Sequence, residues 1–157
     1  MLGLALVAFK EWHDLMKKLK IAILVIFLVI VAWIAFRYVW VSYYNRGSNY
    51  MASGEYDKAI LCFDKSIKIK PKFAPAYCNR GTCYYEKNEY EQAIEDFTKA
   101  LDLNPELVEA YYNRATACYQ KKEYDKAWED VHKAQSMDYQ IPPDFLEALR
   151  DASGRER

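Results

Sequence analysis

The chain has 157 residues, of which 52% are hydrophobic and 28% are charged, a composition that excludes disorder along its whole length. Lysine and arginine together number 22, as do aspartate and glutamate, so the formal net charge is zero. A balanced chain has no general positive field to attract nucleic acid, and we expect no nucleic-acid partner.

The charge is divided unevenly along the chain. Residues 1–40 hold five basic and two acidic groups, which leaves 17 basic and 20 acidic groups for the remaining 117 residues. We therefore expect an N-terminal segment and a body of different character.

Residues 1–20 form a basic segment ahead of a long apolar run. Trp12, Leu15, Met16 and Leu19 fall on one face of a helix, which favours an amphipathic helix at a membrane interface. Alternatively, the natural protein begins at Met16, because Met16-Lys17-Lys18 is typical of the start of a bacterial membrane protein. Both interpretations stay open at this point.

The next segment predicts a transmembrane helix over residues 21–41. Ile21 to Phe36 is an uninterrupted run of sixteen apolar residues, which as a helix covers about 24 Å of the ~30 Å hydrocarbon core. If the Arg37 side chain extends to the head groups, the span reaches roughly 21 residues. Aromatic residues at its far end resemble an interfacial belt; they are Trp33, Tyr38, Trp40, Tyr43 and Tyr44.

Two other interpretations of this segment are a cleaved signal peptide and a buried helix of a soluble protein. The signal peptide fits the lysine-rich start but lacks a small-x-small cleavage site, because Trp33 stands two residues before Ala35. No glycine or proline lies between Met16 and Arg46, so we expect the anchor to continue as one helix into the body.

The distribution of positive charge predicts the orientation of the anchor. Four lysines precede the span, and Arg37 and Arg46 follow it. The positive-inside bias places the N-terminus in the cytoplasm and the body on the outer side, in a periplasm if the host is bacterial. The four cysteines argue for the opposite placement.

The body contains a repeat of 34 residues. Tyr43-Tyr44-Asn45-Arg46-Gly47 recurs as Tyr77-Cys78-Asn79-Arg80-Gly81 and Tyr111-Tyr112-Asn113-Arg114-Ala115. The same spacing relates three further sets: Ala59, Ala93 and Ala127; Phe63, Phe97 and Val131; and, in two copies, Pro71 and Pro105. Such a period predicts stacked units that bury a continuous core together.

Each unit is expected to be a helical hairpin. Small residues at Gly47, Gly81 and Ala115 let the two helices approach, while Phe63, Phe97 and Val131 fill the space between one hairpin and the next. Proline ends the second helix.

These residues resemble the tetratricopeptide repeat family over about Val41 to Ile141. The resemblance implies an all-α fold, a right-handed superhelical stack of three hairpins. One departure is arginine at 46, 80 and 114, where the family often has leucine; we expect each arginine stem to cover apolar surface while its head reaches water. The predicted divisions are residues 1–20, the transmembrane helix 21–41, repeats over 42–141 (about 40–73, 74–107 and 108–141), and a capping helix with a tail over 142–157.

The chain after the third repeat predicts this capping helix. Pro142 and Pro143 favour a helix start, and Phe145, Ala148 and Leu149 fall on one face. Residues 153–157 are expected to fray.

The resemblance also implies a concave groove lined by the first helix of each hairpin. We predict a protein or extended-peptide partner there, held by asparagine amides and tyrosine rings. The candidate groove residues are Tyr44, Asn45, Ser48, Met51, Cys78, Asn79, Thr82, Tyr85, Tyr112, Asn113, Thr116 and Tyr119.

Some relatives grip the C-terminal carboxylate of chaperones with lysine and arginine in this groove. The matching positions here are Tyr44, Ser48, Asn79, Glu109 and Asn113. Of these, Asn79 agrees and Glu109 has the opposite charge. We therefore expect a neutral or weakly basic ligand instead of an acidic tail.

Catalysis, metals and cofactors find no support in the sequence. Cys62, Cys78, Cys83 and Cys118 form no CxxC pair and are expected to be buried thiols. His13 and His132 lie in no apparent catalytic set, and no glycine-rich phosphate loop occurs. We predict a membrane-anchored interaction scaffold, which could serve in complex assembly, with no enzymatic activity and no small-molecule substrate. A permanent structural subunit of a membrane complex is the alternative.

Overall fold

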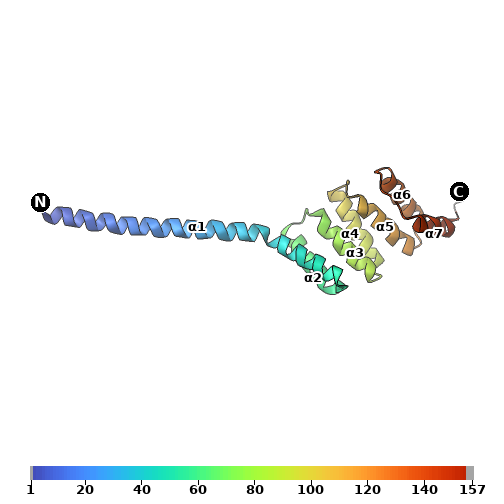
Figure 1. Ribbon diagram of the computed structural model, residues 1–157, viewed down its shortest axis with the longest axis horizontal. Helices are drawn as coiled ribbons and strands as arrows, with labels where there is room; N and C mark the ends of the chain where they lie inside the picture. The colour runs from blue at the N-terminus through green and yellow to red at the C-terminus, as the bar shows by residue number, and fades with distance from the viewer. Residues whose placement is uncertain (1, 155–157) are drawn as a thin grey trace. The chain divides into compact units, whose positions relative to one another are not determined.

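The computed structural model describes residues 2–154, with side chains at residues 9–36 and 38–154. Seven α-helices and short turns make up this described part, and it contains no strand (Figure 1). The all-α prediction is confirmed. The predicted placement of the Arg37 side chain lies outside the described side chains.

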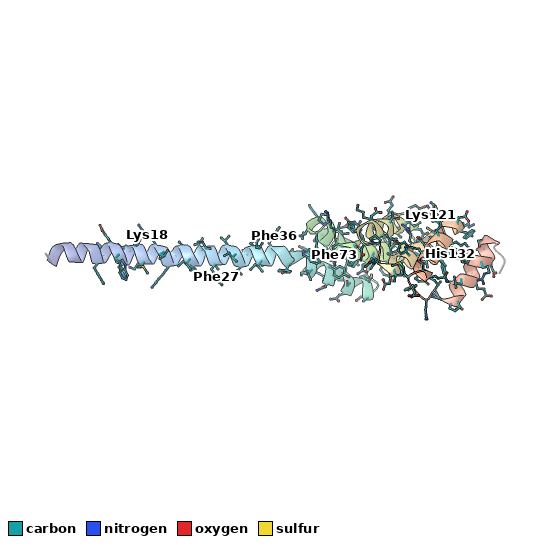
Figure 2. The ribbon with its side chains drawn as sticks, turned by 90° about the horizontal axis from the view of Figure 1, so that it is seen from above. Lys18, Phe27, Phe36, Phe73, Lys121 and His132 are labelled. Carbon is teal, nitrogen blue, oxygen red and sulfur yellow. The ribbon has the colours of Figure 1, made fainter. Side chains whose placement is uncertain are left out.

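The chain divides into two compact units, Met1–Val39 and Trp40–Arg157. The first helix, α1 (Leu2–Ala52), is continuous, which confirms the expectation of an unbroken helix from Met16 into the first repeat. In the N-terminal unit, apolar side chains such as Phe27 and Phe36 project outward from the helix, with exposed fractions of 60% and 67% (Figure 2). By length and composition, this is one helix that could cross a membrane.

The second unit is a row of helical hairpins. The end of α1 and α2 (Tyr56–Ile69) form the first, α3 (Ala74–Glu86) and α4 (Tyr90–Leu103) the second, and α5 (Val108–Gln120) and α6 (Tyr124–Gln135) the third. Neighbouring hairpins meet where α2 packs on α3 and α4 packs on α5. The final helix, α7 (Pro143–Ser153), packs on α6.

The turn inside each hairpin has the same backbone conformation. Gly54, Asn88 and Lys122, spaced by 34 residues, have φ values of +73°, +61° and +62°. Glycine and asparagine enter this left-handed region readily, whereas lysine does so at some cost. The repeated geometry therefore outweighs the local preference in the third hairpin.

Close packing inside the hairpins follows the predicted pattern of small and large residues. A Cβ atom added to Gly81 would lie 2.9 Å from the Phe97 ring, and one added to Gly47 would lie 2.7 Å from the Phe63 ring. The phenylalanines thus fill space within their own hairpins. Phe63 also shares a core cluster with Cys83 of the following hairpin, so the predicted filling between hairpins holds as well.

Helix ends agree with the proline positions. α2 and α4 end two residues before Pro71 and Pro105. In the third repeat, where Tyr139 replaces proline, α6 ends at Gln135 and the chain turns at Asp138, which has a φ of +61°.

The capping helix α7 closes the last hairpin. Leu149 is fully buried, and the indole N–H of Trp128 donates a hydrogen bond to the Ser153 hydroxyl at 3.1 Å. The expectation that fraying begins at residue 153 is therefore wrong for Ser153, because this bond and the helix hold it. Residues 155–157 lie outside the described part.

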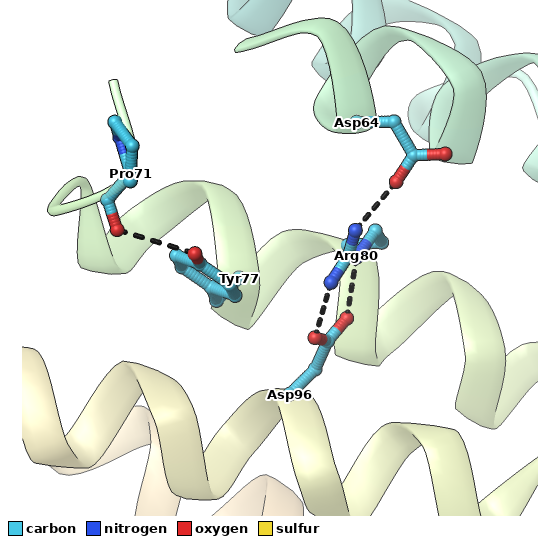
Figure 3. Close-up of polar contacts among 5 residues, drawn as sticks. All are labelled: Asp64, Pro71, Tyr77, Arg80 and Asp96. Atoms are coloured by element: carbon cyan, nitrogen blue, oxygen red, sulfur yellow. Dashed lines mark hydrogen bonds and ion pairs between the residues drawn. The ribbon is translucent and has the colours of Figure 1, made fainter. Parts of the chain in front are cut away.

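The expectation that the repeated arginine heads reach water is wrong for Arg80 and Arg114. Arg80 forms two hydrogen bonds with Asp96 of α4 and one with Asp64 of α2 (Figure 3). Arg114 likewise forms two with Asp130 of α6 and one with Thr98 of α4. Each head pairs with the carboxylate sixteen residues later in its own hairpin, and it also reaches a side chain sixteen residues earlier in the preceding hairpin. The arginines therefore join neighbouring hairpins.

Candidate peptide-binding groove

The predicted groove residues lie on the end of α1, on α3 and on α5. The hydroxyls of Ser48, Thr82 and Thr116 recur at 34-residue spacing, and each donates to a backbone carbonyl of its own helix at 3.2, 3.1 and 2.7 Å. With their protons used in this way, the hydroxyls offer oxygen acceptors to a ligand.

The three asparagines of the predicted ladder have different environments. Asn45 is exposed, whereas the Asn79 amide donates to the Tyr44 hydroxyl at 3.1 Å and so joins the first two hairpins. Asn113 lines a cavity. The ladder is therefore regular in sequence but not in its hydrogen bonds.

A cavity of about 190 Å³ lies between α3 and α5. Five predicted groove residues contribute to its wall: Thr82, Tyr85, Tyr112, Asn113 and Thr116. The structure thus brings these five together around a space that could hold one or two side chains of a bound segment.

Other predicted residues have structural roles. Cys78 is 8% exposed and belongs to the core cluster around Phe97, and Met51 packs against the first core cluster. The Phe145 ring of α7 lies 5.6 Å from the Tyr112 ring and 5.7 Å from the Tyr119 ring. The capping helix therefore covers part of the groove at its C-terminal end.

The first hairpin contributes an aromatic wall. The Tyr44 ring packs edge-on against Phe73 at 5.0 Å and lies 5.9 Å from Phe63. This packing and the bond from Asn79 fix the Tyr44 ring, so it offers a rigid surface to a ligand.

Two cavity residues were absent from the prediction, Glu86 and Phe97. Phe97 belongs to a second helix, and its repeat position indicates only a packing role. Glu86 is the last residue of α3 and is exposed. Its position directly after the predicted groove residue Tyr85 was the feature of the sequence that could have indicated it.

Acidic and neutral groups dominate the groove. Glu86 and Glu109 are both exposed. Burial raises the pKa of the Cys78 thiol to about 11, and the nearby Glu109 carboxylate acts in the same direction. Neutral at physiological pH, this thiol is a poor nucleophile. Among the described residues, no group of histidine, cysteine, aspartate and glutamate could hold a metal ion.

Stacked helical hairpins with a groove along their first helices define a class of protein-interaction module. A family model described as tetratricopeptide repeat matches residues 40–73 and 74–107, and a second model of the same description matches residues 97–129. The chain belongs to the tetratricopeptide repeat family, and its members are interaction modules without enzymatic activity. A comparison with curated proteins found no match.

Solved structures of tetratricopeptide domains share this fold. The Arabidopsis OM64 domain is 24% identical, with a TM-score of 0.70, and the match covers 77% of this chain and 99% of that one. The TPR2B domain of yeast Sti1, in a pHsp70 complex, is 25% identical over 74% and 98%, with a TM-score of 0.67. The second domain of Spaghetti (RPAP3), bound to the HSP90 peptide SRMEEVD, is 26% identical over 62% and 91%, with a TM-score of 0.61.

Proposed function

We propose that the protein is a membrane-anchored scaffold that binds an extended segment of a partner protein in the groove formed by α1, α3 and α5. The cavity between Tyr85, Tyr112 and Asn113 carries this proposal. Similar domains of Sti1 and RPAP3 are described in complexes with pHsp70 and an HSP90 peptide, which supports peptide binding as the general mode.

The segment that this groove binds belongs to a different class from the acidic C-terminal tails of chaperones. At the positions where clamp-bearing relatives use lysine and arginine, this chain has Tyr44, Glu109 and Asn113. An incoming carboxylate would meet Glu109 and Glu86 without a compensating cation, which is repulsive. A neutral or weakly basic segment suits the groove, with its amide groups opposite Asn113 and an apolar side chain in the cavity.

The membrane anchor is supported by the surface of the N-terminal unit. Between Ile21 and Phe36 the apolar side chains are exposed, with fractions of 45% or more for the large ones. A continuous apolar surface of this kind is unfavourable in water and suits the hydrocarbon of a bilayer. The lysines before the span favour a cytoplasmic N-terminus, with the repeats on the outer, periplasmic side.

A site-specific crosslinking experiment tests groove binding. A photoreactive residue placed at Tyr85 in the full chain, in native membranes, should yield a discrete product with a partner. The same residue at Gln92, which is exposed on α4, serves as the control outside the groove. Equal products from the two positions would instead favour a permanent structural subunit, and the absence of products from Tyr85 would contradict the proposal.

A further inference from the structure

The first repeat differs in charge from the two that follow. Residues 40–73 hold six basic and three acidic groups, residues 74–107 hold three and seven, and residues 108–141 hold five and six. The net charges are therefore +3, −4 and −1. The positive charge of the repeats is concentrated in the one that directly follows the apolar segment.

Three lysines near the end of α2 cause most of this difference: Lys68, Lys70 and Lys72. The equivalent positions of the second repeat hold Asp102, Asn104 and Glu106, and those of the third hold Ser136, Asp138 and Gln140. Since α4 ends at the position equivalent to the end of α2 without any lysine there, the fold does not require lysine at these positions.

Two lysines of the first repeat, Lys65 and Lys70, lie over aromatic rings at the start of the second unit. The Lys70 ammonium lies 3.8 Å from the centre of the Trp40 ring, and the Lys65 ammonium lies 5.4 Å from that of Tyr43. Trp40 is itself fixed edge-on against Phe73 at 4.6 Å. Cations above such rings are held close to the ring surface.

These lysines have no ion-pair partner in the described part of the chain. No carboxylate there lies within ion-pair distance of Lys65, Lys68, Lys70 or Lys72. Lys87 and Lys121 of the later repeats, in contrast, each bridge two carboxylates. These four lysines are thus free to bind an external anion.

The connection to the apolar segment indicates which anion. Trp40 follows Phe36 by four residues, a chain length of at most about 14 Å. Tryptophan and tyrosine favour the head-group region of a bilayer, and lysines near its surface are attracted by anionic lipids. We propose that Lys65, Lys68, Lys70 and Lys72 bind the phosphate groups of anionic phospholipids and hold the first repeat against the bilayer; this rests on the proposed membrane anchor.

Lysine acetylation of the full chain in lipid discs tests the proposal. In discs of phosphatidylcholine with phosphatidylglycerol, acetylation of Lys65 and Lys70 should be slower than in discs of phosphatidylcholine alone, and high salt should remove the difference. Lys99 and Lys133, which are exposed on α4 and α6, should react equally in both.

Two matched variants test the role of charge at this place. K68Q/K72Q should lower the equilibrium constant for docking of the first repeat on the anionic bilayer about 30-fold, at roughly fivefold for each lysine. K99Q/K133Q removes the same charge elsewhere and should change nothing. Equal effects of the two variants would overturn the proposal, as would equal acetylation in the two kinds of disc.

Two further measurements test separately whether the bound anion belongs to a lipid and whether the N-terminal helix is inserted in the membrane. Inorganic phosphate or poly-glutamate added to phosphatidylcholine discs should not protect the lysines; protection by either one equal to that in anionic discs would overturn a lipid partner. Insertion is measured beforehand as resistance to alkaline extraction. A chain that does not insert overturns both the anchor and this inference, whereas an inserted chain without protection overturns only this inference.

Discussion

Arg80 and Asp96 form a two-point ion pair between α3 and α4, with distances of 2.7 Å from Nε to Oδ2 and 2.6 Å from Nη2 to Oδ1 (Figure 3). The remaining nitrogen of Arg80, Nη1, lies 2.5 Å from Asp64 of the preceding hairpin. Hydrogen bonds to Asp96 raise the pKa of the Arg80 guanidinium above its ordinary value. One side chain therefore fixes the positions of two hairpins, and Arg114 repeats the arrangement.

Removal of this arginine should destabilise the repeats. Arg80→Ala leaves the Asp96 carboxylate, whose side chain is 7% exposed, without a cation, and the expected cost is about 3 kcal/mol in the free energy of unfolding. Chemical denaturation of the full chain in detergent micelles measures it.

Arg46→Ala is the matched control. Arg46 has the same repeat position, but Cys62 and not a carboxylate stands sixteen residues later, and the guanidinium contacts the Tyr50 hydroxyl and ring. Its loss should cost less than about 0.5 kcal/mol. Equal destabilisation by the two substitutions would show that the buried pairs do not stabilise the stack.

Gly81 of the second hairpin should tolerate a larger side chain only when Phe97, which packs against it, is made smaller. Gly81→Ala places a methyl group 2.9 Å from Phe97, and crowding of this kind costs about 1–3 kcal/mol. The third repeat combines Ala115 with Val131, so F97V should recover much of the loss in the double variant. Strict additivity in thermal unfolding would contradict this coupling.

Buried thiols should make stability fall at high pH. Burial raises the pKa of Cys83 from 9.0 to about 12. Above pH 9 the thiol ionises in the unfolded chain but not in the folded one, so the unfolded state gains stability as pH rises. Between pH 8 and 10.5 the wild type should lose about 1–2 kcal/mol more than Cys83→Ala. An equal loss in denaturation curves of the two proteins would refute this effect.

Much of the fold was predictable from the sequence because it depends on repeated spacing. A period of 34 residues has one simple interpretation, a stack of helical hairpins. Within it, Gly47 and Phe63 mark the close packing, and Pro71 marks a helix end. The Arg80–Asp96 pair was not predicted, because the arginine was compared with a leucine position of the family and not with residues sixteen positions further on. Ser153 was missed because its partner, Trp128, lies on another helix.

The candidate groove was predictable in outline but not in detail. Helical periodicity places Tyr85 and Asn113 on first helices, and both line the cavity. It does not show that Phe145 of α7 packs on Tyr112 and Tyr119, since that contact depends on how the capping helix packs. Helical periodicity also does not show that Cys78 is buried in the core and does not line the groove.

Introducing the missing charges should convert the ligand preference of the groove. In S48N/E109K/N113R, together with Asn79, four of the five clamp positions would match the clamp-bearing relatives, while Tyr44 keeps its packing. The variant should bind the peptide SRMEEVD, which RPAP3 binds, at least about tenfold more tightly than the wild type, because carboxylates pair strongly with lysine and arginine. Calorimetry measures this, with E109Q as the control that removes charge without adding a cation. Equally tight binding by the wild type would contradict the assigned preference.

Selection of peptides by the full chain in lipid discs tests the groove most directly. A random library of extended peptides should yield neutral or weakly basic sequences that bind the wild type and the control Q92A/K99A, with substantial loss of affinity in Y85A/N113A. Selection of acidic C-terminal sequences, or equal loss of affinity in the two double variants, would contradict a peptide-binding groove of this kind.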